Sequence, residues 1–313
     1  MTHSDVRAVA PLVRLLVLSL CVAAFVPQSA VAQAPFMPVT LEESTGRVLL
    51  QLPGLDQDVL YLNALATGLG SARVFGLDAG SGVDEAVVRF ERHGPKVVMV
   101  APNVTMTAAS GDPGQVEGVE RAFPVSVLAT MDIESEAGGS LVVDATDFLL
   151  SDAADIRGTI RNAGLGAVQL ERDKAYVDAS RTGAFPENTE IRTVLTFASD
   201  SLHPVLARHA PDGRATTFEQ HHSFMALPEE PMPGRVFDPR TGNGATVIHD
   251  YSQGFDGDYR IRLTSRWRLE PSDPAAYLRG ELVEPVKPIV LHLDRATPEP
   301  YRTAYREGIA WWT

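Results

Sequence analysis

The sequence predicts an α+β fold that is predominantly β, with an antiparallel, β-rich N-terminal region and short helices inserted. Hydrophobic and polar residues alternate with period two over several stretches, which is typical of strands with one buried face. The 22 prolines and 25 glycines are spread along the chain without a period, which favours many short elements joined by turns. The 44% hydrophobic and 21% charged content of the 313 residues indicates a folded chain, long enough for one large or two ordinary domains.

Residues 1–32 are predicted to be a signal peptide. Arg7 and Arg14 give a weakly basic start, an apolar run covers residues 15–26, and Ala-Val-Ala at residues 30–32 is a small-x-small cleavage site. The apolar run is too short to span a bilayer comfortably, so we expect no stable membrane span after cleavage. A retained signal anchor is the alternative. The chain is therefore predicted to be exported, to the periplasm or the extracellular medium.

Charge and cysteine content exclude several classes of protein. The net charge of -13 and the isoelectric point near 5.0 would repel a nucleic-acid backbone, so no nucleic-acid partner is predicted. Cys21 is the only cysteine, and it lies in the predicted signal peptide. The mature chain would then contain no thiol, which excludes disulfides, thiolate zinc sites and cysteine nucleophiles.

Residues 33–228 are predicted to form the β-rich N-terminal domain, whose function the sequence does not reveal. Its clearest pattern covers residues 86–100. Val88 and Phe90 fall on one face, the chain turns at residues 93–95, and it returns through a second apolar stretch. This pattern predicts a β-hairpin.

Two more strands are expected later in the same domain. Residues 190–198 alternate, with Ile191, Leu195 and Phe197 on one face, and residues 216–227 are a weaker strand candidate.

Between these strands, residues 144–164 carry the best helical possibilities in the middle of the chain, broken by Gly158 and Gly164. Residues 238–260 are rich in Asp and Gly but lack the calcium-loop spacing with a closing glutamate. We expect a structured turn or an Ω-type loop there.

Residues 229–284 are predicted to be a β segment with an arginine ladder and a linker. Over residues 260–269 arginines and apolar residues alternate, so four arginines share one strand face. These candidate anion-facing residues are Arg260, Arg262, Arg266 and Arg268. They form either a groove for a phosphate or carboxylate ligand or salt bridges to neighbouring Asp and Glu. The second interpretation is favoured, because arginine is the preferred residue for ion pairs and forked carboxylate contacts.

Residues 285–313 read as a strand followed by a helix. Residues 289–294 form a short apolar strand candidate, and Thr297 and Pro298 are the expected N-cap and first position of a helix. The helix has one apolar face, made by Tyr301, Ala304, Tyr305, Ile309 and Trp312. No glycine, cap or polar tail closes it, so we expect the chain to be the front part of something longer.

Motifs for chemistry are absent from the sequence. It contains no H-E-x-x-H, G-x-S-x-G, P-loop or G-x-G-x-x-G pattern. His221 and His222 would face opposite ways on a strand, so solvated or hydrogen-bonded side chains are expected rather than a metal site. The pairs His249-Asp250 and His292-x-Asp294 could each contribute to a site, but such pairs are common by chance. No catalytic, cofactor-binding or metal-ligating residue is therefore predicted in this chain.

Several stretches nevertheless resemble one family when taken in order. They are GLGSARVFGLDAG, VVRFERHGPKVVMVAPN, VFDPRTGNG, SRWRLEPSDPAA, EPVKPIVLHLD and PYRTAYREGIAWW. This series is similar to the N-terminal region of large secreted bacterial zinc-dependent metalloproteases, in which a β-rich region precedes a metzincin-like catalytic domain. The resemblance runs from about Leu60 to Thr313.

The resemblance implies that residues 285–313 are the first strand and first helix of a truncated metzincin-like catalytic domain. The zinc ligands of that family lie on a later H-E-x-x-H helix, so zinc is implied for a full-length relative and not for this chain. The implied partners are the missing C-terminal catalytic domain and, in the full-length relative, a peptide or protein substrate. Whether this chain is itself an enzyme stays open, because it resembles a zinc metallopeptidase but lacks the catalytic motif.

Two functions are consistent with these observations. The first is the non-catalytic N-terminal part of an exported zinc-dependent metalloprotease, which hydrolyses peptide bonds in the full-length relative. The alternative is a stand-alone β-rich binding module of the envelope or medium that uses the Arg260–Arg268 face.

Overall fold

The computed structural model describes residues 33–55, 57–70, 74–82, 84–137, 139–253 and 257–311. The chain divides into two compact units, Met1–Ala34 and Pro35–Thr313, and all elements below belong to the second. The predicted signal peptide and Trp312 lie outside the described residues. Within the described ranges, no helix has the length and apolar character needed to cross a membrane.

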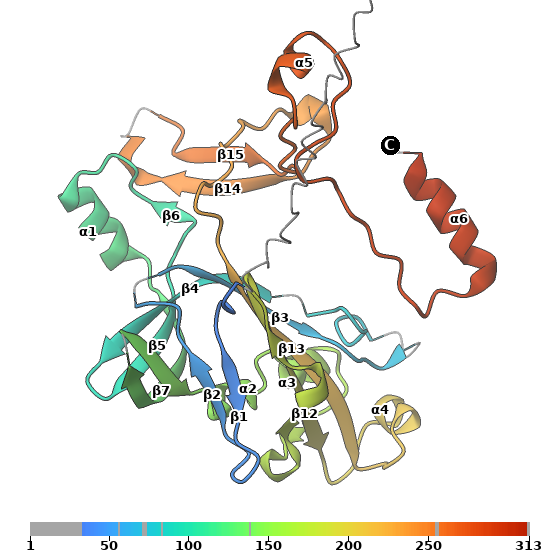
Figure 1. The fold of residues 1–313 in the computed structure, drawn as a ribbon. Helices are drawn as coiled ribbons and strands as arrows, with labels where there is room; N and C mark the ends of the chain where they lie inside the picture. The colour runs from blue at the N-terminus through green and yellow to red at the C-terminus, as the bar shows by residue number, and fades with distance from the viewer. Residues whose placement is uncertain are drawn as a thin grey trace, which may run out of the picture. The chain divides into compact units, whose positions relative to one another are not determined.

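A twelve-stranded sheet is the main feature of the structure (Figure 1). Its strands are β1 (Val39–Leu41), β2 (Val48–Gln51), β3 (Val59–Leu65), β4 (Asp84–His93), β5 (Lys96–Ala101), β7 (Ser126–Ala137), β8 (Ser140–Asp144), β9 (Gln169–Leu170), β10 (Tyr176–Val177), β11 (Gly183–Ala184), β12 (Asn188–Ala198) and β13 (Ala215–Ala226). The order is β1-β2-β8-β7-β5-β4-β3-β13-β12-β10, with β9 and β11 also paired to β12. All of these pairs are antiparallel, so the predominantly β, antiparallel prediction is confirmed.

The helices are short. They are α1 (Pro113–Ala122), α2 (Thr146–Leu149), α3 (Ile156–Asn162), α4 (Pro204–His209), α5 (Pro274–Leu278) and α6 (Glu299–Ala310), with 3₁₀ turns η2 (Arg172–Lys174), η3 (Ala179–Arg181), η4 (Pro239–Thr241) and η5 (Tyr251–Gln253).

The large sheet curls into an antiparallel half-barrel. Residues just before β1 meet residues at the opposite end of the strand order. The backbone N–H of Phe36 donates to the carbonyl of Phe185 at 2.8 Å, and the Thr189 hydroxyl donates to the carbonyl of Met37 at 2.7 Å. These contacts hold the two ends of the sheet together around its inner face.

The predicted hairpin is present as β4 and β5. His93 pairs with Lys96, so the loop has two residues, and Gly94 takes a left-handed conformation (φ 62°) that suits a tight hairpin. Val88 and Phe90 are fully buried, as the alternation predicts.

The inner face of β12 and β13 contributes residues to two apolar clusters. Ile191 and Phe224 belong to the cluster within the curled sheet, whereas Leu195, Phe197 and Phe218 pack against α3 and α4 in a second cluster. Both predicted strands are therefore confirmed, including the weaker one, because each supplies buried residues at every second position.

The prediction that Gly158 breaks a helix is wrong. Gly158 lies inside α3, and its N–H donates to the side chain of Asp155, the N-cap residue, at 3.2 Å. A Cβ on Gly158 would lie 2.0 Å from the Asp155 carboxylate. Position 158 thus requires glycine, because the Asp155 carboxylate lies too close for a side chain. Gly164 follows the end of the helix as predicted.

A three-stranded sheet contains β6 (Met106–Thr107), β14 (Ala245–Asp250) and β15 (Arg260–Thr264), in the order β15-β14-β6. β14 and β15 are antiparallel, and β14 and β6 are parallel. The prediction of a loop over residues 238–260 is therefore wrong, because the stretch contains β14. The pairing with β6 also crosses the predicted boundary between residues 33–228 and 229–284.

Two strand predictions in the C-terminal part fail for lack of a partner. The strand expected over residues 260–269 ends at Thr264, which pairs with the first residue of β14, Ala245. Residues 289–294 are not in a strand, since no described segment pairs with them. α6 begins one residue later than expected, with Pro298 as its N-cap residue.

Candidate functional site

The predicted arginine ladder is divided between β15 and the segment after it. Arg260 donates to the Asp258 carboxylate at 3.0 Å, and this hydrogen bond lowers the pKa of Asp258. Arg268 donates to the Glu270 carboxylate at 2.6 Å. Two of the four guanidinium groups are therefore paired with carboxylates two residues away in the chain.

The remaining arginines differ from each other. Arg266 donates to the backbone carbonyl of Pro233 at 3.0 Å. Arg262 is exposed and makes no hydrogen bond or ion pair in the described part of the chain, although its charge adds to that of Arg260 in lowering the pKa of Asp258. The structure therefore offers one guanidinium without a hydrogen bond at this position and not a row of four.

The two adjacent histidines of β13 face opposite sides of the sheet, as expected. His221 lies on the outer face, where its Nε2 is 2.5 Å from Glu190 of β12. His222 lies on the inner face and is fully buried. Both ring nitrogens of His222 have protein partners, so this histidine could not bind a metal ion without breaking a protein contact.

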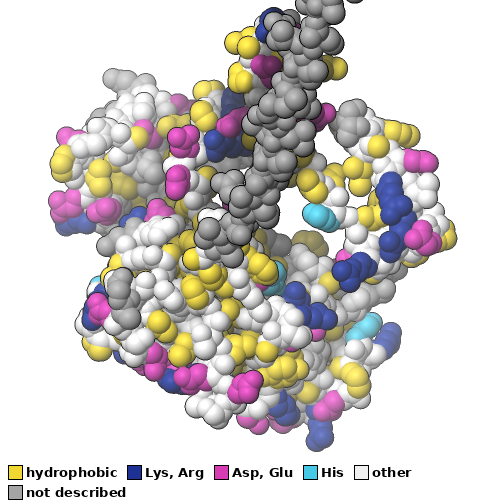
Figure 2. Space-filling view, viewed as in Figure 1, with side chains coloured by type: hydrophobic (Ala, Val, Ile, Leu, Met, Phe, Trp, Pro, Cys, Tyr) yellow, Lys and Arg dark blue, Asp and Glu magenta, His cyan; other side chains and the backbone are white. Residues whose placement is uncertain are grey.

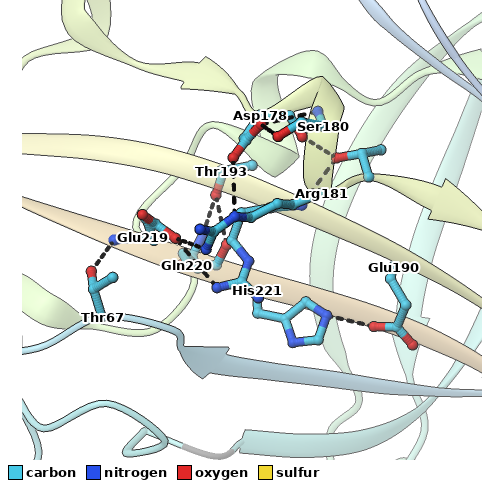
Figure 3. A network of polar contacts seen from close by, with 11 residues as sticks. Thr67, Asp178, Ser180, Arg181, Glu190, Thr193, Glu219, Gln220 and His221 are labelled. Atoms are coloured by element: carbon cyan, nitrogen blue, oxygen red, sulfur yellow. Dashed lines mark hydrogen bonds and ion pairs between the residues drawn. The ribbon is translucent and has the colours of Figure 1, made fainter. Parts of the chain in front are cut away.

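The outer face carries a network of polar contacts, shown from close by in Figure 3. Arg181 and Arg192 both reach the same Glu219 oxygen, at 3.3 and 3.4 Å. The backbone N–H of Glu219 donates to the Thr67 hydroxyl at 2.8 Å, and Arg181 also lies 3.6 Å from Asp178. The network ties η3, β12 and β13 to the segment after β3.

Glu190 is the centre of a smaller group on the same face. Burial opposes its ionisation, but hydrogen bonds from His221, Ser223 and Asn188 outweigh burial and lower its pKa. The Ser223 hydroxyl donates to Glu190 at 2.7 Å. A serine nucleophile needs to give its proton to a histidine base, and here Ser223 donates to Glu190, so the three side chains are not arranged as a Ser-His-Asp triad.

A buried polar row crosses the inner face between the two apolar clusters. His222 Nδ1 lies 2.8 Å from the Tyr61 hydroxyl and 3.3 Å from Asn63 Nδ2, while its Nε2 lies 2.9 Å from Gln220 Nε2 and 3.1 Å from the Leu149 carbonyl. Burial lowers the pKa of His222 to about 3, so the imidazole is neutral at physiological pH. Burial likewise raises the pKa of Tyr61.

Sequence reasoning missed this row. The alternation of the stretch LYLNAL puts Tyr61 and Asn63 on the same strand face. Asn63 is polar at a position where an apolar residue is expected, and this was the sequence signal for a buried polar group. The pairing of that face with His222 depends on which strands are neighbours, and spacing along one chain does not reveal neighbours.

The pair His249-Asp250 does not form a metal site. Asp250 is almost fully buried and accepts hydrogen bonds from the Ala109 N–H (3.0 Å), the Ser252 hydroxyl (2.6 Å) and the Gln253 amide (2.7 Å). The Ser252 hydroxyl and the other donors lower the pKa of Asp250 well below its usual range. The carboxylate is thus already occupied, and it joins β14 to the segment that carries β6.

The zinc that the family resemblance implies belongs to a full-length relative, and the resemblance places none of its ligands in this chain. Among the described residues, no group of three or more His, Cys, Asp or Glu side chains could hold a metal ion. The buried histidine and Asp250 are both committed to protein donors and acceptors.

An exposed apolar surface is the most unusual feature of the C-terminal segment. Trp267, Ile289, Tyr301, Tyr305 and Ile309 contribute to an open, mainly apolar pocket of about 810 Å³. No described residue of α6 is buried. Figure 2 shows hydrophobic side chains on the surface of this segment beside lysine and arginine side chains. The predicted apolar face of α6 is confirmed for its described members, but it is not covered.

Comparison with known proteins identifies one family. Residues 80–272 match the family described as Domain of unknown function (DUF5117). The match covers β4 to β15 and leaves β1–β3 and α6 outside. No match was found among curated proteins or among solved structures. Because the matched range is more than half of the 313 residues, the chain belongs to the DUF5117 family.

Proposed function

We propose that this chain is the non-catalytic, β-rich region of an exported zinc-dependent metallopeptidase, and that its C-terminal segment binds the catalytic region of that enzyme. In this proposal the chain hydrolyses no peptide bond itself. Its large sheet is a rigid support, and residues 285–311 together with Trp267 make the contact.

The exposed apolar surface carries the proposal. Trp267, Tyr301 and Tyr305 are 63%, 60% and 56% exposed, although an amphipathic helix normally buries its apolar stripe against another element. Large aromatic side chains that share one exposed patch mark surfaces that bind another polypeptide. The surface therefore supports a protein partner more directly than a small polar ligand.

The resemblance supports the identity of that partner. The stretches EPVKPIVLHLD and PYRTAYREGIAWW, which supply most of this surface, are those that resemble the opening of a metzincin-like catalytic domain. The DUF5117 match ends at residue 272, before this segment begins. A catalytic region whose own first elements lie here would cover Ile289, Tyr305 and Ile309.

The first experiment tests the absence of catalysis in this chain. The purified protein is incubated with casein, with and without added zinc, and bound zinc is measured by elemental analysis. We expect no zinc-dependent hydrolysis and no stoichiometric zinc. Zinc-dependent peptidase activity of the purified chain would refute the proposal.

The second experiment tests the contact. The catalytic region of a secreted zinc metalloprotease whose N-terminal region resembles this chain is prepared as a separate polypeptide and titrated calorimetrically with this chain. Tyr305→Ser should weaken binding about tenfold, as expected when one well-buried aromatic contact is lost from an interface. Tyr277→Ser is the matched control, because Tyr277 is equally exposed but lies on α5, outside the pocket. Equal affinities for the wild type and Tyr305→Ser would show that this surface does not bind the catalytic region.

A further inference from the structure

A second pocket lies on the inner face of the large sheet, next to the buried polar row. It has a volume of about 300 Å³, at the lower end of the range for small-ligand sites. Its lining includes Tyr61, Asn63, Asp84 and Phe148, and no lysine, arginine or histidine is among the described residues that line it. The pocket is separate from the apolar surface of the C-terminal segment.

Strand register places its polar groups on one face. Asp84 of β4 is directly opposite Asn63 of β3, which is directly opposite His222 of β13. Residues directly opposite each other in an antiparallel sheet project to the same side. The Asp84 carboxylate therefore belongs to the same row as Asn63 and His222, at the open end of that row.

Two oxygen acceptors in this row, those of Asp84 and Asn63, lack a partner. Asp84 is exposed and makes no hydrogen bond or ion pair in the described part of the chain. Asn63 is 1% exposed, its Nδ2 faces His222, and its Oδ1 has no hydrogen-bond partner. A buried polar atom without a partner is costly and uncommon in folded proteins, so a donor from outside the chain would be stabilised there.

We propose that this pocket binds an ammonium or guanidinium group, such as the side chain of lysine or arginine in a peptide. The unpartnered groups are acceptors, and Asp84 adds a negative charge with no basic residue in the lining to neutralise it. Tyr61 and Phe148, whose ring centroids are 5.6 Å apart, provide aromatic surface of the kind that stabilises organic cations. The net charge of -13 favours the approach of a cation.

A divalent metal ion fits the pocket less well. Such ions take six or more oxygen ligands, several of them carboxylates. Asp152 also lines the pocket, but its carboxylate already accepts hydrogen bonds from Arg157 (2.9 Å) and from the N–H of Ile156 (2.8 Å). Glu85 lines the pocket as well, but it follows Asp84 directly in β4 and so projects from the other face of the strand. Asp84 is then the carboxylate available for a ligand on the shared strand face.

The test uses the full chain and calorimetric titration. The probes are N-acetyl-lysine methylamide, n-butylamine, the uncharged N-acetyl-norleucine methylamide and calcium chloride. We expect the lysine derivative to bind and the norleucine derivative not to bind. Asp84→Asn should weaken binding of the lysine derivative about tenfold, the effect of losing one charge-assisted hydrogen bond. Glu120→Gln, which removes an equally exposed carboxylate on α1, should leave the affinity unchanged.

The outcomes separate the possible ligands. Binding of the lysine derivative alone assigns the pocket to peptide side chains, and equal binding of butylamine assigns it to small amines. The proposal is overturned by binding of norleucine and lysine derivatives with equal affinity, by wild-type affinity in Asp84→Asn, by binding of calcium alone, or by no heat of binding with any probe. None of these results depends on whether the C-terminal segment binds a catalytic region.

Discussion

The large sheet and the C-terminal region differ in what happens to their apolar residues. Among the described residues, every buried apolar side chain except Ala276 lies between Met37 and Phe224. In the C-terminal region, residues 229–311, the large apolar residues are mostly exposed, including Trp267, Leu282 and Tyr301. Both regions contain alternating or helical apolar patterns in the sequence.

A periodic pattern determines which residues share a face and does not by itself bury that face. β12 pairs with β13 over eleven residues, and α3 and α4 cover part of that face. β15 pairs with β14 over five residues, and the apolar side chains beyond Thr264 have no second layer. Burial requires a packed second layer as well as the pattern.

The largest expected effect is a difference in how much one core substitution and one exposed substitution lower the stability of the protein. Phe197→Ala removes a fully buried ring from the second apolar cluster and should lower the free energy of unfolding by about 3–5 kcal/mol. Tyr305→Ala on α6 should change it by less than about 0.5 kcal/mol, because the side chain is exposed. Urea unfolding followed by circular dichroism measures both.

Similar losses of stability in both variants would contradict this difference between the two regions. They would mean that the face of α6 is covered within this chain in solution, and the proposed contact with a catalytic region would lose its surface.

The sequence predicted the large sheet better than the sites on it. The faces of residues 86–100 and 190–198 follow from alternation, because side chains of successive strand residues project to opposite sides. Alternation did not predict where strands end. β15 ends where its partner β14 begins, and residues 289–294 form no strand because no described strand pairs with them.

The polar row on the inner face shows why site prediction was harder. Tyr61, Asn63 and Asp84 lie within 24 positions of the chain, but their partner His222 is more than a hundred residues away. The pocket exists only when β3 lies between β4 and β13. Strand order is a property of the whole fold, so the sequence showed two adjacent histidines and not their different roles.

His222 should make the stability of the large sheet sensitive to acid. Its pKa is about 3 in the folded chain and near 6.5 in an unfolded one, so the unfolded state binds more protons between these values. Stability therefore falls as the pH falls, by about 2 kcal/mol between pH 7 and pH 5 for this one group. Urea unfolding at several pH values measures the slope.

The matched variant is His222→Gln, which carries no titrating group at this position. Its stability should be lower overall but should change less between pH 7 and pH 5 than that of the wild type. Parallel slopes for the two proteins would show that His222 is not held neutral in the row and would weaken the argument for a buried polar layer.

A smaller effect is expected where the C-terminal region meets the segment that carries β6. Asp250→Asn places a side-chain amide against the Gln253 amide. It also removes the negative charge of the carboxylate that accepts hydrogen bonds from the Ala109 N–H and the Ser252 hydroxyl. We expect a loss of about 1–2 kcal/mol. Faster hydrogen exchange of the Ala109 amide, measured by NMR, would locate that loss. Unchanged exchange at Ala109 would show that this contact is not what joins β14 to that segment.

The smallest effect should come from the arginines of the predicted ladder. Arg260 and Arg268 are each paired with a nearby carboxylate, and exposed pairs of this kind contribute little to stability. Arg262 is the one member of the ladder without a hydrogen bond or ion pair in the described structure, and a single exposed guanidinium is weak recognition for an anion. Arg262→Ala should therefore leave both the unfolding midpoint and the weak binding of phosphate or acidic peptides unchanged. A large, salt-sensitive loss of anion binding in this variant, absent in Arg240→Ala on η4, would instead restore the Arg260–Arg268 face as a binding surface and make the C-terminal region the functional part of the molecule.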